Sequence, residues 1–381
     1  SSAAERLAAR GWTVDVIDAA DGPGQGASGN HAGVLRPLPS LDDNRLGRLT
    51  RAGTLYGLRH LAYLAGLGQP VRHQACGVLH LARDDAQEIR QHAVVERLQQ
   101  PTDFLRYVDA AGASEIAGWP VSQGGWWFPS AAWVQPPSLC RANLAAHPTR
   151  IRCHFGRRVA AIRHDGSSWQ ALDAQGVCIA AAPQLILANG TDIRELPQAA
   201  ALPVVSARGQ VSLLPAATSS PPRVVVCRGG YVSPEVDGLR CAGATFAAGD
   251  EDSALRLADH EENLARLEGI LPGYTATLSA ATLGGRVGFR PASPDRLPMV
   301  GAVPLPGRLD RPLKLRDIPR QEGLWAVSGF GARGLVWAAL MGETIAAMLC
   351  GEPLPLEDDL SDAIDPARFL LRPPRPLRGD D

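Results

Sequence analysis

The order of hydrophobic and polar positions at the start of the chain predicts a helix followed by a strand. Residues 1–11 have the pattern of a helix that ends at Gly11, and the apolar residues 12–17 predict a strand that ends at Asp18. A helix and a strand in this order form the second half of a βαβ unit. In dinucleotide-binding folds, a first strand and a GxGxxG loop precede the helix, and the acidic residue after the second strand binds the ribose.

The first strand and the glycine loop of such a unit are absent from this sequence, which also has no initiator Met. We therefore expect the chain to have been cut from a longer parent just after that loop. On these residues alone, two interpretations of Asp18 have equal weight. It is a ribose ligand, or it is a solvated residue at the end of an ordinary strand.

The middle of the chain alternates between strand and helix patterns. The apolar run 184–188 predicts a buried parallel strand that closes on Asn189 and Gly190, a turn that presents backbone to a cofactor. Further strands are expected at 77–81, 122–128, 152–155, 158–162, 169–172, 210–214 and 224–227, and further helices at 41–67, 84–99 and 252–271.

Near the end of the chain, a strand passes through a glycine-rich turn into an apolar helix. The strand is expected at 324–327, the turn at 329–334 and the helix at 335–349. Free backbone N–H groups at the start of this helix face the turn. Such a helix start suits an anionic or electron-accepting group.

The composition is that of an ordinary soluble protein with room for two domains: 381 residues, 45% hydrophobic and 20% charged, with a net charge of −1. This charge gives no pull toward nucleic acid. No long uncharged apolar run and no secretory signal is present, so we expect a cytoplasmic protein without a membrane partner. The cysteines form no CxxC pair and no Cys/His cluster, so we expect reduced thiols and no metal site; they are Cys76, Cys140, Cys153, Cys178, Cys227, Cys241 and Cys350.

Seven segments carry a resemblance to a known family: 26–30 (GASGN) with Gly33 and Pro37, Trp133-Val134 with Pro136, 208–210 (RGQ), 290–304, 329–335, 351–355 (GEPLP) and 365–368 (DPAR). With them, the chain resembles the flavin-dependent amine oxidases of the D-amino-acid oxidase superfamily, from residue 1 to about residue 370. The block 290–304 is shared across the superfamily. The segments 26–30 and 351–355 are typical of its tRNA-modifying branch.

This resemblance implies an α/β fold in which a Rossmann-like FAD-binding domain is interleaved with an antiparallel-sheet substrate domain, here without the N-terminal strand and glycine loop. The methyltransferase domain that is normally fused to this branch is also absent from the sequence. The implied FAD-binding domain takes residues 1–58, 133–200 and 285–370, the substrate domain takes 59–132 and 201–284, and 371–381 form a loose tail.

The resemblance also implies an activity, that of an oxidoreductase acting on CH–NH bonds with noncovalent FAD. Its substrate is 5-carboxymethylaminomethyl-(2-thio)uridine at the tRNA wobble position, which loses its carboxymethyl group and becomes 5-aminomethyl-(2-thio)uridine. The flavin carries the chemistry and the protein places the substrate. No residue is a convincing general base. We expect no covalent flavin link, because the segments around Arg290 and Arg333 contain no cysteine.

Arg290 takes the family's position for binding the substrate carboxylate, a role that suits its planar fork. Without the resemblance, a structural ion pair with Asp295 or a C-terminal carboxylate would be favoured. For Arg333, three roles stay open: holding the flavin, contacting the substrate or completing the turn. The implied cofactor residues are Asp18 at the ribose, Val159 at the adenine, Ser28, Gly29, Asn30, Asn189 and Gly190 toward the pyrophosphate, and Gly329, Gly331, Ala332, Gly334 and Leu335 at the flavin.

Two other functions stay open: an oxidase of a free small amine such as glycine or sarcosine, and an inactive remnant that binds RNA or a partner without FAD. Tryptophans 119, 126, 127 and 133 could stack on an RNA base, although a core role is favoured. The arginines of the tail, Arg368, Arg372, Arg375 and Arg378, could contact tRNA phosphates or form a solvated end.

Overall fold

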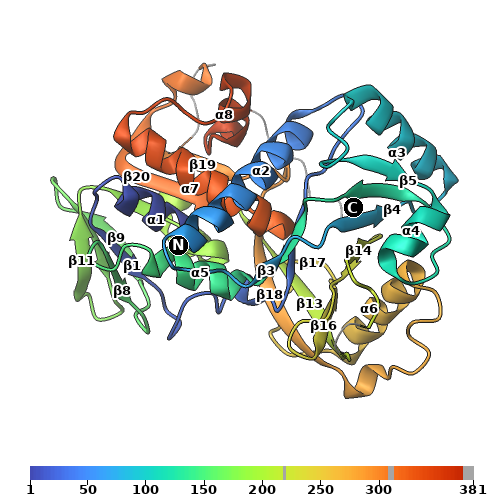
Figure 1. The fold of residues 1–381 in the computed structure, drawn as a ribbon. Coiled ribbons are helices and arrows are strands. Elements are labelled where there is room, and N and C mark those ends of the chain that lie inside the picture. The colour runs from blue at the N-terminus through green and yellow to red at the C-terminus, as the bar shows by residue number, and fades with distance from the viewer. Residues whose placement is uncertain (218–219, 308–312, 372–381) are drawn as a thin grey trace.

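The computed structural model describes residues 1–217, 220–307 and 313–371, and the predicted helix and strand form at its start (Figure 1). Helix α1 (Ser2–Ala9) leads into β1 (Val14–Ile17), which pairs in parallel with β8 (Ile151–His154). Strand β12 (Leu185–Leu187) pairs in parallel with β20 (Arg320–Ser328). These two parallel pairs therefore lie in separate sheets, and β1 pairs with no strand other than β8 in the part of the chain that the structure describes.

Helix α7 (Gly334–Cys350) is the centre of this first region. Trp337 on α7 is fully buried, and α1 and α2 (Arg45–Gly66) both pack on the helix. The approach of α1 is close because Gly342 has no side chain, and a Cβ there would come within 2.8 Å of Ser2. The same region contains β19 (Met299–Pro304), α5 (Pro136–Ala145), α8 (Asp358–Ile364) and α9 (Arg368–Leu371).

One helical segment of the described residues, Gly331–Cys350, has the length and apolar character of a membrane span. Of its most apolar window, 56% is buried inside the protein. This burial is what a core helix requires, since such a helix must be apolar on most of its faces.

The second region is a nine-stranded sheet organised around β13 (Val205–Pro215). The order along the sheet is β17-β13-β16-β15-β14-β4-β6-β5, and β18 (Gly284–Ala292) pairs antiparallel with β13 over its whole length. The other strands are β4 (Val78–Leu81), β5 (Arg106–Val108), β6 (Gly125–Phe128), β14 (Val225–Cys227), β15 (Tyr231–Val232), β16 (Leu239–Gly243) and β17 (Ala247–Ala248).

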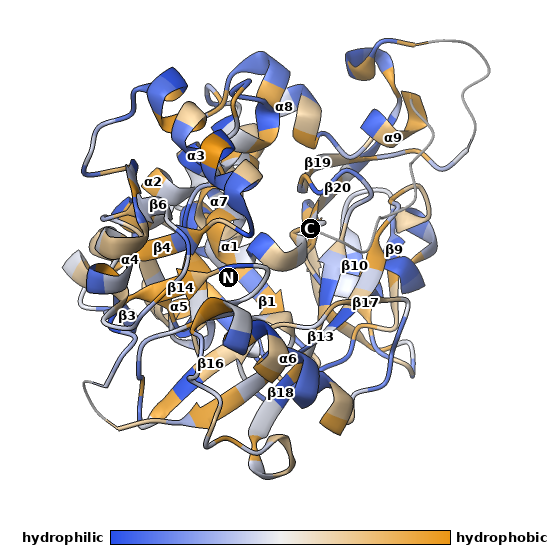
Figure 2. Ribbon diagram, turned by 90° about the vertical axis from the view of Figure 1, so that its right-hand side faces the viewer, coloured by the Kyte–Doolittle hydropathy of each residue, from blue (hydrophilic) through white to orange (hydrophobic). Residues whose placement is uncertain are grey.

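The two faces of this sheet are covered by different elements. One face packs on α4 (Ala110–Ala117) and α6 (Leu257–Ile270). The other packs on α3 (Asp85–Leu98) and on residues 32–34, which come from the first region. Figure 2 shows hydrophobic colouring in strands such as β4 and β14 and mixed colouring on α6, so the strands form the apolar interior and α6 an amphipathic cover.

A small sheet joins the two regions. In it, β2 (Gly33–Leu35) pairs with β7 (Ala132–Val134), and alternate residues enter different cores because strand side chains alternate in direction. Leu35 and Val134 pack around α7, whereas Trp133 packs on the nine-stranded sheet. The remaining elements are β3 (His73–Gln74), β9 (Ala161–His164), β10 (Trp169–Leu172), β11 (Cys178–Ala182), η1 (Ala27–Gly29), η2 (Gly190–Glu195), η3 (Pro197–Ala199), η4 (Ala280–Thr282), η5 (Leu315–Asp317) and η6 (Gly331–Arg333).

Most predicted elements are present, and four of them begin three to five residues later than expected, namely those predicted at 41–67, 122–128, 158–162 and 252–271. The helix expected at 252–271 begins at Leu257. Its first residues are irregular instead, with a bend at Ala254, because Arg256 binds the carboxylates of Asp250 at 2.5 Å and Asp252 at 2.8 Å. The strand expected at 158–162 begins at Ala161, so the predicted adenine contact Val159 lies in the loop before β9.

The division into FAD-binding and substrate domains stays a prediction. Three elements cross its boundaries: α2 is one continuous helix through residue 58, β7 spans the boundary after residue 132, and β18 spans the one after residue 284 and belongs to the nine-stranded sheet. Of the predicted loose tail, 371–381, the first residue ends α9, and the others, with Arg372, Arg375 and Arg378, lie outside the described residues.

The four tryptophans favour the core interpretation. Trp126, Trp127 and Trp133 are only 7%, 8% and 8% exposed. Trp119 packs edge-on against Tyr274 and donates its Nε1 hydrogen to the carbonyl of Pro272 at 3.0 Å. Stacking on an RNA base would require the three buried rings to leave their cores.

Candidate active site

Arg290 lies on β18, and its guanidinium rests on bare backbone of the neighbouring strand β13. A Cβ at Gly209 would overlap this guanidinium, so only glycine leaves room for it. Nη1 of Arg290 donates to the carbonyl oxygen of Thr245 at 3.2 Å. Within the described residues Arg290 makes no second hydrogen bond and no ion pair, which leaves its other N–H donors for a ligand.

The alternative role of Arg290, a structural ion pair, is not supported. Its expected partner Asp295 pairs with Arg368 instead, at 2.8 Å between Nε and Oδ2. Burial lowers the pKa of the Arg290 guanidinium, against the effect of Tyr231 and together with that of Arg266. An arginine nevertheless stays protonated at neutral pH. The site therefore holds a positive charge that no carboxylate of the described residues neutralises.

A buried cluster of polar side chains joins the two regions close to Arg290. Nδ2 of Asn30 donates to the hydroxyl of Tyr231 at 2.8 Å, and this hydroxyl donates to the carbonyl oxygen of Ala32, also at 2.8 Å. Sγ of Cys241 lies 3.0 Å from the Tyr231 hydroxyl and 3.2 Å from Oδ1 of Asn30. The predicted cofactor residue Asn30 is thus hydrogen-bonded to β15 and β16 of the nine-stranded sheet.

Tyr231 is a site residue that the sequence analysis missed. It is a lone aromatic residue after Gly229 and Gly230, with no spacing that marks a motif. Burial raises the pKa of its hydroxyl well above the usual value. The phenol therefore stays protonated at neutral pH and acts as a hydrogen-bonding group, not as a base.

Cys241 bears on the expected noncovalent link to FAD. The sequence argument considered only the segments around Arg290 and Arg333, and the fold brings a thiol from β16 to Asn30 instead. Burial raises the pKa of Cys241 to about 11, so the thiol is neutral and poorly nucleophilic at neutral pH. Noncovalent binding stays the prediction.

The predicted cofactor residues Ser28 and Gly29 lie in η1, beside β18. A Cβ at Gly29 would overlap the guanidinium of Arg286, so this glycine accommodates an arginine. Nη2 of Arg286 donates to the carbonyl oxygens of Gln25, at 2.5 Å, and of Gly26. The segment that resembles a flavin-binding motif is therefore in contact with a second arginine of β18.

The glycine-rich turn before α7 has the geometry that the sequence predicts. Gly329 (φ 75°) and Gly331 (φ 51°) adopt the left-handed conformation that favours glycine. No side chain caps α7, so N–H groups of its first turn keep donors for a ligand. A bridge between Ala292 and Phe330 attaches the turn to the end of β18.

The remaining residues of this turn lie between the two regions. The side chain of Leu335 covers Gly33, where a Cβ would come within 2.6 Å of Cδ1. Arg333 is half-buried at the cap position of α7, Ala332 is exposed and Gly334 is the first residue of the helix. The three roles of Arg333 stay open.

A second group of predicted residues gathers at the ends of β1 and β8. The exposed Asp18 accepts a hydrogen bond from the backbone N–H of Ala20 at 2.9 Å. Its carbonyl accepts from the N–H of Arg157 at 3.0 Å, which brings the loop with Val159 alongside.

Asn189 and Gly190 lie with the residues around β18, not with Asp18 at the ends of β1 and β8. They follow β12, with Gly190 in the left-handed conformation (φ 62°), and open η2, which contacts β18. Strand β18 is thus the common neighbour of η1, η2 and the turn before α7.

The residues around β18 and the residues at the ends of β1 and β8 suit the two ends of FAD. An uncapped helix start at a glycine turn suits the electron-accepting ring, and an exposed acid after β1 suits the ribose. The glycine loop that dinucleotide folds use for the pyrophosphate is not among the 381 residues. The residues present therefore fit the ring and ribose portions of the cofactor.

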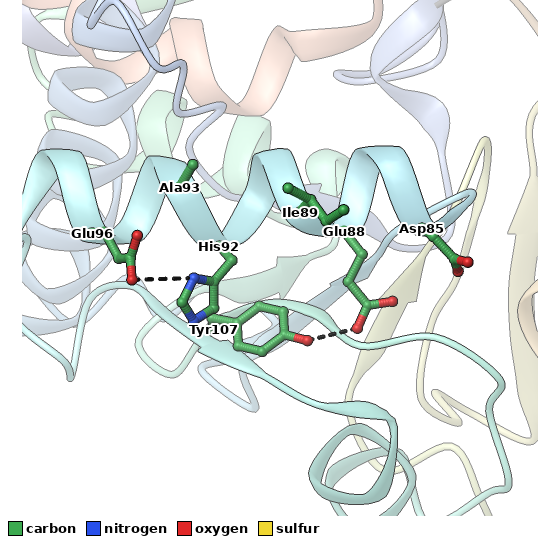
Figure 3. Close-up of a pocket in the computed structure, with 7 residues that line it drawn as sticks. All are labelled: Asp85, Glu88, Ile89, His92, Ala93, Glu96 and Tyr107. Carbon is green, nitrogen blue, oxygen red and sulfur yellow. Dashed lines mark hydrogen bonds and ion pairs between the residues drawn. The ribbon is translucent and has the colours of Figure 1, made fainter.

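An open groove along α3 and β5 lies at the other edge of the sheet (Figure 3). In it, Tyr107 donates to Oε1 of Glu88 at 2.6 Å, and Nδ1 of His92 lies 3.4 Å from Oε1 of Glu96. Its carboxylates would repel an anionic substrate. The groove is lined by Asp85, Glu88, Ile89, His92, Ala93, Glu96 and Tyr107.

Parallel strands, an uncapped helix start and an arginine without a carboxylate partner among the described residues are what a flavin-dependent enzyme of this fold requires. The sequence model of the family described as FAD dependent oxidoreductase matches residues 1–348, and the chain belongs to this family. The predicted fold class and the predicted class of enzyme are confirmed.

Among characterised relatives, the chain is similar to the tRNA 5-methylaminomethyl-2-thiouridine biosynthesis bifunctional proteins MnmC. It is 68% identical, over its full length, to the protein of Azoarcus sp. (strain BH72) and 65% identical, over 98% of its length, to that of Aromatoleum aromaticum. The chain spans 60% and 59% of these relatives' lengths.

Two solved structures show the same fold. Iminodiacetate oxidase (IdaA) from Chelativorans sp. BNC1 matches with a TM-score of 0.74 and 26% identity, covering 93% of this chain and 94% of that one. Glycine oxidase from Bacillus cereus matches with a TM-score of 0.76 and 18% identity, covering 95% and 94%. The second match concerns the fold alone.

Proposed function

We propose that this chain uses FAD to remove the carboxymethyl group from 5-carboxymethylaminomethyl-(2-thio)uridine at the wobble position of tRNA, leaving 5-aminomethyl-(2-thio)uridine. The observation that carries the proposal is the 68% identity, over the full chain, to a protein named for 5-methylaminomethyl-2-thiouridine biosynthesis in tRNA. The chain spans 60% of that relative's length, so the tRNA substrate is part of the proposal.

The match to iminodiacetate oxidase supports the chemistry. Iminodiacetate is a secondary amine with two carboxymethyl groups, and the arm of the modified uridine is a secondary amine with one. Both molecules present an N–CH₂–carboxylate unit. The same match favours a second candidate, an oxidase of a free carboxymethyl amine.

In this proposal, Arg290 binds the carboxylate of the arm. A guanidinium suits a carboxylate because two parallel N–H groups meet its two oxygens, and this fixes the orientation of the adjoining methylene. Tyr231, which stays protonated, offers a neutral hydroxyl beside this pair. Placement of the methylene is the contribution of these residues to catalysis.

FAD, when bound, supplies the acceptor of a hydride from the methylene next to nitrogen. Water then hydrolyses the substrate imine to the primary amine and glyoxylate. The raised pKa values of Tyr231 and Cys241 keep the proton on both groups at neutral pH, so neither takes a proton from the amine. The substrate amine therefore has to reach the site in its neutral form.

The proposal extends to the setting of the reaction. FAD is bound noncovalently, since the Cys241 thiol is neutral and engaged by Asn30. The reaction takes place in the cytoplasm. Conversion of the aminomethyl product to a methylaminomethyl group requires a methyltransferase, which we assign to the part of the relatives that this chain does not span.

The test is the visible spectrum of the 381-residue chain with FAD, recorded without oxygen before and after addition of carboxymethylaminomethyl-modified tRNA. The proposal predicts loss of the oxidised flavin bands with this tRNA and none with unmodified tRNA or glycine. Loss with iminodiacetate but not with tRNA would favour the free-amine oxidase. Failure of the chain to bind FAD would remove the oxidase function from this chain.

A further inference from the structure

A second arginine of β18 has the same unusual surroundings as Arg290. Arg286 donates only through Nη2, to the carbonyls of Gln25 and Gly26. Among the described residues no carboxylate pairs with it, and its Nε and Nη1 groups have no acceptor. Burial lowers the pKa of this guanidinium as well. A partly buried cation whose N–H donors lack acceptors destabilises the folded protein unless an anion binds it.

The two arginines share one face of the strand. Positions 286, 288 and 290 point to the same side because strand side chains alternate. Four residues of strand separate the two Cα atoms by about 13 Å. Between them, Gly288 pairs with Gly209 of β13, and neither has a side chain.

Both guanidiniums lean over this pair of glycines. A Cβ at Gly209 would overlap Arg290, and a Cβ at Gly288 would come within 3.2 Å of Nη1 of Arg286. The two glycines thus form a strip of backbone without side chains of its own, over which one guanidinium leans from each end. Like charges so placed repel each other unless each meets an anion.

The strip opens toward solvent at the Arg286 end. A Cβ at Gly288 would lie 3.7 Å from Cα of Ala27, and residues 25–28 are exposed. Arg290, at the other end, lies next to Tyr231 and the turn before α7. A ligand would therefore place one anion inside, at Arg290, and a second anion near the surface, at Arg286.

We propose that Arg286 binds the backbone phosphate of the nucleotide whose carboxylate arm is bound by Arg290. This inference rests on the proposed function and makes it specific. A carboxymethylaminomethyl nucleotide has an anion at each of its two ends, whereas glycine or sarcosine has a single carboxylate. Arg286 then acts as the residue that selects an RNA substrate over a free amine with one carboxylate. Bidentate binding of phosphate is the ordinary use of an arginine fork.

The experiment measures binding of a fluorescently labelled anticodon stem-loop, with and without the carboxymethylaminomethyl group, to the 381-residue chain at several salt concentrations. For Arg286→Gln we expect about tenfold weaker binding of both RNAs and a salt slope smaller by about 0.7, the value for one phosphate contact in a single strand. Arg286→Lys keeps the charge and is expected to keep the slope. The matched control is Arg97→Gln, which removes an exposed arginine of α3.

Binding of FAD and of riboflavin by the same variants identifies the source of the phosphate. The proposal requires unchanged affinity for both flavins in Arg286→Gln. If this variant loses FAD affinity, keeps riboflavin affinity and keeps the RNA salt slope, Arg286 binds the cofactor's phosphate and the proposal is wrong. Equal RNA binding by Arg286→Gln and Arg97→Gln would also overturn it.

The proposed function fails in a different way. If the wild-type chain does not prefer the modified RNA and Arg290→Gln changes nothing, the carboxylate arm is not recognised, and both proposals are lost. A retained preference for the modified RNA together with a silent Arg286→Gln refutes only the phosphate contact. Thermal unfolding of each variant, followed by circular dichroism, shows whether the fold is intact.

Discussion

Arginines on the two faces of the nine-stranded sheet differ in how many of their N–H donors have a partner. On the face toward α6, Arg208 of β13 is 1% exposed, and it pairs with Asp259 at 2.5 Å and donates to the carbonyls of Asp252 and Ala254 at 2.6 and 2.7 Å. On the opposite face, Arg290 of the adjacent strand makes one hydrogen bond within residues 1–217, 220–307 and 313–371, to Thr245 at 3.2 Å. A residue that is already satisfied holds the fold together, whereas one with free donors is available to a substrate.

The segment 208–210 serves both faces because its side chains alternate. Arg208 and Gln210 point toward α6, where Oε1 of Gln210 accepts from the N–H of Arg256 at 2.8 Å and fixes the start of the helix. Gly209 points the other way and makes room for Arg290. Residues 208–210 thus stabilise the packing of α6 on one face and leave room for Arg290 on the other.

The largest effect is expected from Arg208→Met. This change leaves Asp259, whose side chain is 15% exposed, without its partner. Breaking a buried ion pair on one side costs about 3 to 5 kcal/mol of the free energy of unfolding. Chemical denaturation measures this loss. The matched variant Arg290→Met removes an unpaired charge and should change the same quantity by less than about 1 kcal/mol. Equal losses of the free energy of unfolding in Arg208→Met and Arg290→Met would contradict the structural role assigned to Arg208 alone.

The next largest effect is expected from Arg290→Met, and it concerns activity. Loss of a charge-assisted bond to the carboxylate, about 3 kcal/mol, lowers kcat/KM by more than about 100-fold. Steady-state kinetics with the modified tRNA measures it. Arg290→Lys keeps the charge without the planar fork, so its kcat/KM should lie between those of Arg290→Met and the wild type. A full rate with methionine at this position would show that the carboxylate binds elsewhere.

Alkaline pH tests the buried thiol of the site. In the folded state the pKa of Cys241 is raised from 9.0 to about 11, so the folded protein keeps a proton that the unfolded chain releases. Stability therefore falls as pH rises from about 9 to about 11, by on the order of 2 kcal/mol from this group. The free energy of unfolding, measured across this range, should fall less steeply in Cys241→Ala. Parallel curves for variant and wild type would contradict this role.

Gly209→Ala has the smallest expected effect. The added methyl group would push the Arg290 guanidinium aside without removing it, so we expect a loss of about tenfold in kcat/KM, or 1.4 kcal/mol. The control is Gly269→Ala on α6, where a Cβ meets no atom within 4 Å and activity should not change. An active Gly209→Ala variant would mean that Arg290 has another position from which to bind.

Sequence patterns were most reliable where one element carries the whole signal. The apolar helix α7, its glycine turn and the strand before it follow from local periodicity and from the backbone freedom of glycine. The start of α6 was placed too early, because the ion pairs of Arg256 with Asp250 and Asp252 hold residues 252–256 in an irregular conformation. Such pairs depend on side-chain positions that periodicity does not contain.

Residues of the site that come from distant strands were not accessible to this reasoning. Tyr231 and Cys241 meet Asn30 across about 200 residues of chain, and neither belongs to a motif. Arg286 lies only four residues before Arg290, but its contact with Gly29 depends on η1 lying against β18. Alternation along a strand would have placed both arginines on one face, had β18 been recognised as a strand of the sheet.

The sequence by itself determined the class of fold and the class of flavin-dependent enzyme, and it predicted a role for Arg290, because motifs and periodicity are properties of short segments. Only the tertiary structure decided which charges are satisfied. Whether a guanidinium has a carboxylate partner depends on what the sheet, α6 and η1 bring to it from other parts of the chain. That is why Arg208 and Arg290, close to motif glycines in both cases, differ so completely in what they can bind.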